Sequence, residues 1–346
     1  MFSPIRTDRL VIRAPEPGDV NSLHARRNHP EVAKLQDWDY PYPMEKARAL
    51  VESVVARGEP TNDEWWMAMV CLGDGPVVGD LVVHLTWEGR TAEVGYSLDR
   101  EHWGRGYATE ALAAFVDYLF DGLAVTRVFA MLDPANRASA RLLERTGFLY
   151  EGRTRLSYWK DDEPSDDLIY GMTRSDREAW VSRARYPPKE ITFIEVNTEN
   201  LGDVANLKTH ESQKEFVAPM LWSFSDAHFP EVVDGAPVVP WMRAVLADGQ
   251  LAGFVMLALA TENHPEPYLW RLLIDRMHQR RGIGKRVIGM IVDQCRDWGD
   301  QALVTSWAEG VGSPRPFYLA LGFETTGRIV DEETEARLVF DRREKQ

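Results

Sequence analysis

Two stretches of the same form, Glu101-His-Trp-Gly104-Arg-Gly106 and Gln279-Arg-Arg-Gly282-Ile-Gly284, decide how this chain folds. A glycine-rich turn lets backbone N–H groups approach a phosphate, and a helix that starts there adds the positive end of its dipole. Apolar residues follow each turn at the spacing of an amphipathic helix: Ala108, Leu112, Val116, Leu119 and Leu123, then Val287, Ile291, Val292 and Cys295. The two turns therefore predict two sites for an anionic nucleotide cofactor.

The repetition extends beyond the turns. Gly147-Phe148 follows Gly104 after 43 positions, and Gly322-Phe323 follows Gly282 after 40 positions. Corresponding points of the two halves are thus 175 to 178 residues apart. This period is the length of a domain and not that of a solenoid repeat, so it predicts a tandem duplication.

The boundary between the copies is also readable. Ser175-Asp-Arg-Glu178 has the form of a capping box and opens a predicted helix to about Ser182, and Tyr186-Pro-Pro-Lys189 then interrupts helical structure. A strand-like run at 191–196 follows and resembles the run at 9–13 that opens the chain. We predict an N-terminal domain at 1–185 and a C-terminal domain at 189–346.

Alternating apolar runs before each turn predict strands, and short loops between them favour antiparallel hairpins. The predicted strands are 65–71, 77–85 and 92–98 in the first half and 242–246, 253–259 and 270–274 in the second. The predicted fold class is α/β of the α+β type, with two tandem domains that each have a mostly antiparallel, mixed sheet flanked by helices. A doubly wound dinucleotide fold would place its glycine turn after the first strand.

Composition and charge limit the function classes. The chain has 346 residues, 44% of them apolar, and a net charge of −14, which argues against nucleic-acid binding and is compatible with a cationic partner. Cys71 and Cys295 are expected to be buried thiols. The eight histidines show no paired ligand spacing, so no metal site is expected. The start of the chain lacks a signal-peptide core and no apolar run approaches 18 residues, so we expect a cytoplasmic protein without a membrane partner.

These residues, in this order, resemble the GNAT family of N-acetyltransferases. His102-Trp-Gly-Arg-Gly-Tyr-Ala-Thr-Glu-Ala111, with Gly147-Phe148, is similar to the branch that acetylates ribosomal-protein N-termini and small amines. In the second half, 213–219, 223–227 and 269–275 resemble diamine and spermidine acetyltransferases. Two departures stand out: Glu101 occupies a place where the family has Gln or Arg, and the stretch 309–314 lacks the asparagine found shortly before the last helix.

The resemblance implies acetyl-CoA as co-substrate, held by the glycine turns and by Asn136. The residues that it assigns to the cofactor are Trp103, Gly104, Arg105, Gly106, Tyr107, Ala108 and Asn136 in the first half, and Gln279, Arg280, Arg281, Gly282, Ile283, Gly284 and Lys285 in the second. Nicotinamide and nucleotide-triphosphate motifs fit less well, because a third glycine and a Ser or Thr after Lys285 are both missing.

Acetyl transfer to an amine needs a base and an acid. Glu93 is the predicted base of the first half, and Ser139 is implied by the resemblance as its acid. Tyr318 is the predicted acid of the second half, where Glu262 and Glu266 are weaker candidates for the base. Purely structural roles stay open for each of these: a solvent-facing strand glutamate for Glu93, a helix cap for the Asn136 to Ser139 segment, and a buried helix tyrosine for Tyr318.

The acceptor is less well specified. Asp37-Trp-Asp-Tyr-Pro-Tyr42 combines carboxylates and aromatic rings that could hold an ammonium group, or it is a loop packed on its domain. The acidic stretch 161–167 is predicted to be a solvated hairpin loop near the first site. The leading hypothesis is acetyl-CoA-dependent N-acetylation of a small amine such as an antibiotic, amino acid or polyamine. Acetylation of a protein N-terminus or basic peptide, one degenerate scaffold domain, and a homodimer are left open.

Overall fold

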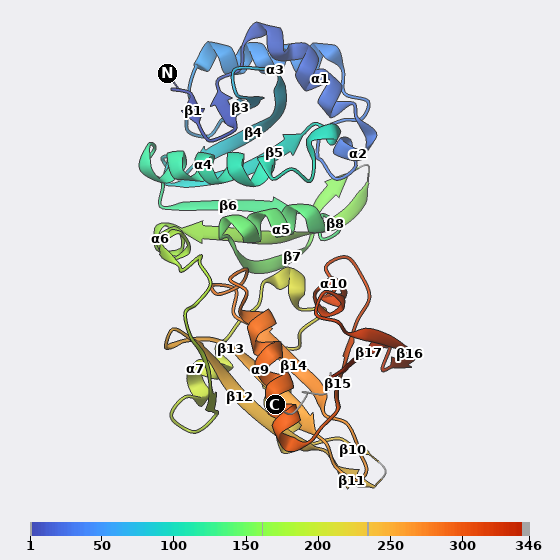
Figure 1. Cartoon of the computed structure of the whole chain (residues 1–346). Coiled ribbons are helices and arrows are strands. Elements are labelled where there is room, and N and C mark those ends of the chain that lie inside the picture. Colours follow the sequence, from blue (N-terminus) through green and yellow to red (C-terminus); the bar gives the residue numbers. More distant parts are fainter. Residues whose placement is uncertain (1, 161, 234, 341–346) are drawn as a thin grey trace. The chain divides into compact units, whose positions relative to one another are not determined.

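The computed structural model describes residues 2–160, 162–233 and 235–340. The chain divides into two compact units, an N-terminal unit (Met1–Val181) and a C-terminal unit (Ser182–Gln346). Each unit has a mixed sheet flanked by helices (Figure 1), which confirms the predicted fold class. The cores are separate as well, because the hydrophobic clusters of the described residues each belong to one unit.

The N-terminal sheet has eight strands in the order β1-β2-β3-β4-β5-β6-β8-β7. They are β1 (Ile5–Arg6), β2 (Leu10–Arg13), β3 (Trp65–Leu72), β4 (Val77–Thr86), β5 (Thr91–Leu98), β6 (Arg127–Leu132), β7 (Leu149–Lys160) and β8 (Glu163–Thr173). Strands β5 and β6 run parallel and pair at three positions only, from Thr91↔Arg127 to Glu93↔Phe129. Beyond Glu93 the two strands part, while β5 stays paired with β4 and β6 with β8.

Helices of the N-terminal unit connect and cover these strands. They are the 3₁₀ helix η1 (Pro17–Asp19), α1 (Val20–Arg27), α2 (Pro30–Ala33), α3 (Met44–Arg57), the 3₁₀ helix η2 (Arg100–His102), α4 (Tyr107–Asp121), α5 (Arg137–Thr146) and α6 (Arg174–Ser182). Helix α4 follows the first glycine turn, as the apolar spacing predicts. Figure 1 shows α4 and α5 in front of the strands of this sheet.

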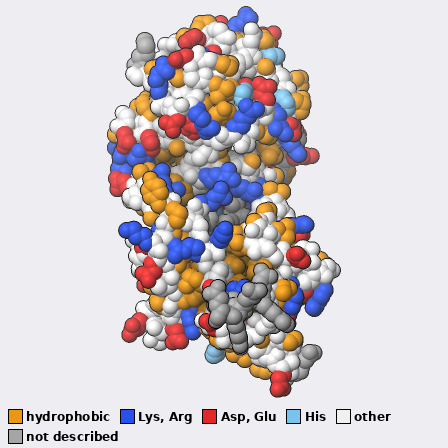
Figure 2. Space-filling view, in the orientation of Figure 1, with side chains coloured by type: hydrophobic (Ala, Val, Ile, Leu, Met, Phe, Trp, Pro, Cys, Tyr) orange, Lys and Arg blue, Asp and Glu red, His pale blue; other side chains and the backbone are white. Residues whose placement is uncertain are grey.

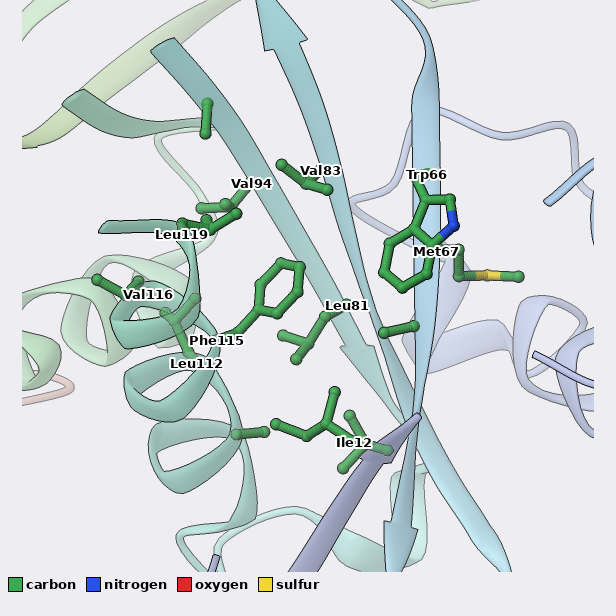
Figure 3. Close-up of a cluster of buried hydrophobic side chains, with 14 of the residues drawn as sticks. Ile12, Trp66, Met67, Leu81, Val83, Val94, Leu112, Phe115, Val116 and Leu119 are labelled. Carbon is green, nitrogen blue, oxygen red and sulfur yellow. The ribbon is translucent and has the colours of Figure 1, made fainter. Parts of the chain in front are cut away.

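The apolar stripe of α4 forms one side of the N-terminal core. Leu112, Phe115 and Leu119 are fully buried, and Figure 3 shows them facing side chains of the sheet, among them Leu81 and Val94. Alternation along β5 turns Val94 toward this core and Glu93 to the opposite face of the strand. Burial of these apolar side chains fixes the helix over the strands and so places the glycine turn at its N-terminus.

The C-terminal sheet has the order β16-β17-β15-β14-β13-β12-β9, and a small hairpin, β10-β11, is separate from it. The strands are β9 (Ile191–Glu195), β10 (Val232–Val233), β11 (Ala236–Pro237), β12 (Val239–Ala247), β13 (Gln250–Leu259), β14 (Tyr268–Ile274), β15 (Ala302–Trp307), β16 (Glu324–Val330) and β17 (Glu333–Val339). The helices are α7 (Leu201–Ala205), the 3₁₀ helix η3 (Glu211–Gln213), α8 (Met220–His228), α9 (Ile283–Trp298) and α10 (Arg315–Leu319).

The two sheets repeat one topology. The order β3-β4-β5-β6-β8-β7 corresponds to β12-β13-β14-β15-β17-β16, and in each unit the long helix after the glycine turn connects the two parallel strands. The parallel pair β14 and β15 is joined at a single position, Tyr268↔Val304. Both units therefore place the N-terminus of a long helix beside two parallel strands that part.

Two apolar clusters lie on opposite faces of the C-terminal sheet. Val245 and Val255 belong to the cluster of α9, whereas their neighbours Ala244 and Phe254 belong to the cluster of α7 and α8. Since adjacent strand residues point to opposite faces, the two clusters mark the two sides of this sheet. We call them the α9 face and the α8 face.

One predicted loop is largely strand. The acidic stretch 161–167 was expected to be a solvated hairpin loop, yet Glu163, Ser165 and Asp167 are part of β8. They pair with β7, which continues to Lys160, so the polar composition reflects an exposed hairpin and not an unpaired segment. Asp161 lies outside the described residues. The predicted buried thiols are confirmed, since Cys71 and Cys295 are both buried and free.

Candidate functional site

The glycine turn of the N-terminal unit leads into α4 through two left-handed residues. The angle φ is +74° at Gly104 and +81° at Gly106, where a residue with a Cβ atom is strained. Gly106 is the N-cap of α4, and no side chain caps this helix. The N–H groups of the first helical turn therefore lack an internal acceptor and carry the positive end of the helix dipole. This geometry favours an anionic ligand.

Arg9 fixes this turn from outside its own segment. Its Nη1 donates to the carbonyl oxygen of Arg105 (3.0 Å), and its Nε donates to Glu110 Oε2 in the first turn of α4 (2.6 Å). Burial tends to raise the pKa of the Glu110 carboxyl, but hydrogen bonds from Thr7 and Arg9 outweigh burial, and the pKa is lowered. The Arg9 guanidinium also lies 4.6 Å from the Tyr107 ring centre. The sequence does not indicate this contact between Arg9 and Glu110, because the two residues are 101 positions apart.

The predicted cofactor contacts beside this turn are arranged around its backbone. Trp103 donates from Nε1 to the carbonyl oxygen of Leu98 (2.9 Å), so its ring closes the end of β5 while remaining 42% exposed. Tyr107 and Ala108 are the first two residues of α4. The segment 103–108 thus combines a fixed backbone with an accessible ring.

Ser139 lies where β5 and β6 part. Its Oγ is 2.6 Å from the hydroxyl oxygen of Tyr96, and the Asn136 side chain accepts from the Ser139 N–H (3.1 Å) as the N-cap of α5. Asn136 therefore has the structural role of a helix cap. Burial raises the pKa of the Tyr96 phenol, although its hydrogen bond with Ser139 acts the other way. Tyr96 was missed by sequence analysis, since only the fold brings it beside a residue 43 positions later.

Glu93 lies on the other face of β5 from Tyr96. It faces His84 across the strand pair β4–β5 and lines a cavity of about 1070 Å³, which also reaches Tyr96 and Asp167. Burial raises the pKa of the Glu93 carboxyl; nearby His84 opposes the shift, while Asp37 and Asp167 add to it. Glu93 is thus partly buried at a cavity and is not a freely solvated strand residue. A carboxylate with a raised pKa is a better proton acceptor.

Several side chains of the aromatic loop 37–42 contact other residues of the N-terminal unit. The Arg27 guanidinium lies 4.6 Å from the Trp38 ring centre and 4.7 Å from that of Tyr42. The carboxylate of Asp39 is paired with Lys46. Arg27 therefore provides a cation contact to the Trp38 and Tyr42 rings from within the protein, which agrees with the alternative that this loop packs on its domain. Asp37, Trp38 and Tyr42 all line the cavity, so a role of this loop in holding an ammonium group stays a prediction.

The C-terminal glycine turn repeats the left-handed start of its helix. Gly282 has φ +76° and is the N-cap of α9, again with no side-chain cap. A second left-handed residue, Arg280, has φ +64°. The turn lines a cavity of about 1290 Å³, to which Arg280 and Lys285 also contribute. Cationic side chains and unpaired helix N–H groups therefore meet at this end of the cavity.

Two side chains of this turn make hydrogen bonds to other parts of the C-terminal unit. Gln279 Nε2 donates to the carbonyl oxygen of Ile274 (3.0 Å) and to Gln213 Oε1 (2.8 Å). Arg281 is only 4% exposed, and its Nε donates to the carbonyl oxygen of Tyr186 (2.9 Å). The side chains of Gln279 and Arg281 thus shape the turn. Ile283 is buried in the core, and Gly284 lies near the Phe317 ring, which leaves the backbone as the part of these residues that can meet a ligand.

Tyr318 lies on the α9 face, stacked on Trp307 with ring centres 5.7 Å apart. It is 8% exposed and lines the C-terminal cavity. Burial raises the pKa of its phenol, and a hydrogen bond with Thr305 acts the other way. Tyr318 is therefore both a buried helix residue and a residue of the cavity wall.

The segment that lacks the family's asparagine has its own arrangement. Glu309 accepts from Trp307 Nε1 (3.1 Å) and Thr334 Oγ1 (3.0 Å). The helix that follows, α10, has five residues and no side-chain cap, whereas α5 in the N-terminal unit has ten residues and is capped by Asn136. The two units therefore differ in the length and the capping of this second helix.

The structure disfavours both weaker candidates for the base of the C-terminal unit, although Glu266 lines the cavity. Glu266 is in an ion pair with Arg337 (2.5 Å), and this hydrogen-bonded partner lowers the pKa of the Glu266 carboxyl. A lowered pKa makes a carboxylate a poorer proton acceptor. Glu262 is exposed and is not part of the cavity lining.

Among the residues that the structure describes, no group of three or more His, Cys, Asp or Glu side chains could hold a metal ion. No helix within residues 2–160, 162–233 and 235–340 is both long enough and apolar enough to cross a membrane.

Both units match models of one protein family. Residues 9–149 match the family model "Acetyltransferase (GNAT) domain", and residues 203–323 match "Acetyltransferase (GNAT) family".

Individual known proteins are similar to part of this chain. The Bacillus subtilis (strain 168) protein named Uncharacterized N-acetyltransferase YoaA is 28% identical over 175 residues, which are 50% of this chain and 98% of that protein. The Probable N-acetyltransferase YjcK from the same organism is 33% identical over 142 residues, covering 40% of this chain and 77% of its own length. A solved acetyltransferase (GNAT family) from Bacillus anthracis is 25% identical and covers 50% of this chain and 99% of its own, with a TM-score of 0.45.

Proposed function

This chain belongs to the GNAT family of acetyltransferases, and we propose that it transfers the acetyl group of acetyl-CoA to the primary amine of a small molecule. The observation that carries this proposal is the glycine turn at the start of α4, and again of α9, beside two parallel strands that part. Such a turn offers backbone N–H groups to a pyrophosphate, and the parted strands open the sheet beside it.

The charge distribution supports an anionic co-substrate at these turns. Figure 2 shows basic side chains gathered over α5, whose sequence includes Arg137, Arg141 and Arg145. In the C-terminal unit Arg280 and Lys285 line the cavity beside the turn. The thioester of acetyl-CoA would supply the activated acetyl group, and the chain's own residues would supply orientation and proton transfer.

The acceptor must lose a proton before it can attack. An alkylamine with a pKa near 10.4 is almost fully protonated at pH 7, so deprotonation costs about 4.6 kcal/mol. Glu93, with its raised pKa and its place in the N-terminal cavity, is proposed as the proton acceptor of that unit. Ser139, supported by Tyr96, is proposed to protonate the departing thiolate. The two proposed groups lie on opposite faces of β5, which separates the acceptor side from the leaving-group side.

A cationic acceptor fits the lining of the N-terminal cavity. Carboxylates of Asp37, Glu93, Asp133 and Asp167 are among its walls. Of the basic residues there, Arg27 already stacks on two rings. Negative potential at a cavity raises the local concentration of a cationic substrate and its association rate.

Two measurements test this function on the full chain. Isothermal titration with acetyl-CoA is expected to show two sites per chain, and a single site would contradict two intact cofactor units. Thiol release with a panel of small primary amines, and separately with basic peptides, measures turnover. Turnover with peptide N-termini alone would overturn the small-molecule assignment, and turnover with neither class would overturn the proposed function.

A further inference from the structure

Three side chains of the C-terminal unit form a continuous hydrogen-bonded chain in its cavity. The Tyr268 hydroxyl oxygen is 2.6 Å from Ser306 Oγ, and Ser306 Oγ donates to Glu333 Oε2. All three residues line the cavity that also holds the glycine turn and Tyr318. None of the three was singled out by sequence, because they come from β14, β15 and β17.

The direction of the protons along this chain follows from chemistry. A carboxylate only accepts, so the single hydroxyl proton of Ser306 is committed to Glu333. The bond between Ser306 and Tyr268 must then use the phenolic proton of Tyr268. Tyr268 has no second proton to give, and its oxygen can only accept from a group in the cavity. This arrangement is built for a ligand that donates, such as an ammonium group.

The strand register places these three hydrogen-bonded side chains on the other face of the sheet from Tyr318. Ser306 pairs with Glu335 and shares its face of the sheet with Glu333, two residues away on β17. Thr305 and Trp307, the neighbours of Ser306, point to the α9 face, where Tyr318 stacks on Trp307. The hydrogen-bonded chain and Tyr318 are therefore on opposite faces, as Glu93 and the Ser139–Tyr96 pair are in the N-terminal unit.

We propose that Tyr268, Ser306 and Glu333 form the proton-accepting relay of the C-terminal unit, with Tyr268 as the catalytic residue that touches the acceptor ammonium. The relay rests on the proposed function. One ammonium proton passes to Tyr268 Oη while the Tyr268 proton passes to Ser306 Oγ and the Ser306 proton passes to Glu333. Nitrogen keeps the electron pair and forms the C–N bond with the acetyl carbonyl carbon. The C–S bond breaks, sulfur leaves with its electron pair, and the second nitrogen proton ends on sulfur. Glu333 then returns its proton to solvent.

The test uses the full chain with Glu93→Gln and Ser139→Ala, so that turnover reports on the C-terminal unit. Glu333→Gln keeps an oxygen that accepts from Ser306 but cannot take the proton. For an alkylamine we expect kcat to fall by about 10²–10⁴-fold, with the acetyl-CoA Kd unchanged. For an aromatic amine that is already neutral at pH 7 we expect less than about a tenfold loss, because the proton to be removed is absent.

Further variants separate a relay from a structural role. Tyr268→Phe and Ser306→Ala should show the same selective loss, and Ser306→Thr should restore activity because it keeps a hydroxyl. Glu332→Gln is the matched control, since Glu332 is exposed and outside the cavity lining. Equal losses of Glu333→Gln with both amines would overturn the relay. Absence of turnover in the Glu93→Gln, Ser139→Ala background would also overturn it, while wild-type turnover would leave the proposed function standing.

Discussion

At the scale of single residues, Glu93 couples stability to activity. Burial raises the pKa of its carboxyl, so the folded state favours the protonated form, and the resulting stabilisation is lost as the pH rises through the folded-state pKa. We therefore expect Glu93→Gln to raise the melting temperature at pH 8 more than at pH 4. Calorimetric scans at the two pH values measure this difference.

The same substitution should lower turnover by the N-terminal unit. In the full chain carrying Gly282→Val, we expect Glu93→Gln to reduce kcat with an alkylamine by about 10²–10⁴-fold. Glu88→Gln is a suitable control, because the Glu88 side chain is 82% exposed. Unchanged kcat would assign Glu93 a structural role.

Tyr318 is the corresponding residue on the leaving-group side of the C-terminal unit. In the Glu93→Gln, Ser139→Ala background, Tyr318→Phe should lower kcat without changing the acetyl-CoA Kd. Loss of its hydrogen bond with Thr305 should reduce stability by about 1 kcal/mol, as measured by urea unfolding. Tyr186→Phe, at a site 83% exposed, should change neither quantity. A lower acetyl-CoA affinity in Tyr318→Phe would instead indicate a binding role.

At the scale of elements, each glycine turn depends on backbone conformation. An added Cβ at Gly104 or Gly282 meets no atom within 4 Å, so the obstacle to substitution is the positive φ. Holding a non-glycine residue there costs about 1–3 kcal/mol, which should distort the turn and remove its N–H groups from a ligand. We expect Gly104→Val or Gly282→Val each to remove one acetyl-CoA site in titration.

A glycine of similar conformation supplies the control for this prediction. Gly58 ends α3 with φ +72° and also has open space around its Cβ position. Gly58→Val should cost stability to a similar degree and leave both acetyl-CoA sites intact. Two remaining sites in Gly104→Val would contradict the assignment of that turn to the co-substrate.

At the scale of the whole molecule, two units with separate cores should respond separately to ligand. A ligand at 100 times its Kd stabilises the unit that binds it by about 2.7 kcal/mol. Acetyl-CoA should therefore raise the melting temperature of both units, and in Gly282→Val only that of the N-terminal unit. Differential scanning calorimetry measures both, and an unchanged shift in the variant would show that the C-terminal turn does not bind the ligand.

Sequence alone determined the architecture. The turns at 101–106 and 279–284 predict a helix after each, since positive-φ glycines and apolar spacing are local properties that need no knowledge of partners. The repeat of about 175 residues likewise predicts two copies of one fold. Individual candidates such as Glu93 also follow from strand alternation near a turn.

Only the tertiary structure decided which side chains meet. The bonds of Tyr96 with Ser139 and of Tyr268 with Ser306 span 43 and 38 positions, and Ser306 reaches Glu333 across 27 more. Those contacts depend on where parallel strands part and on the register of the next strand, and local periodicity specifies neither. Long-range pairing also affects Glu266, which the sequence offers as a candidate base. In the fold its carboxylate forms an ion pair with Arg337, a residue 71 positions away. Local backbone preferences thus fix the frame of each unit, while long-range strand pairing selects the groups that face its cavity.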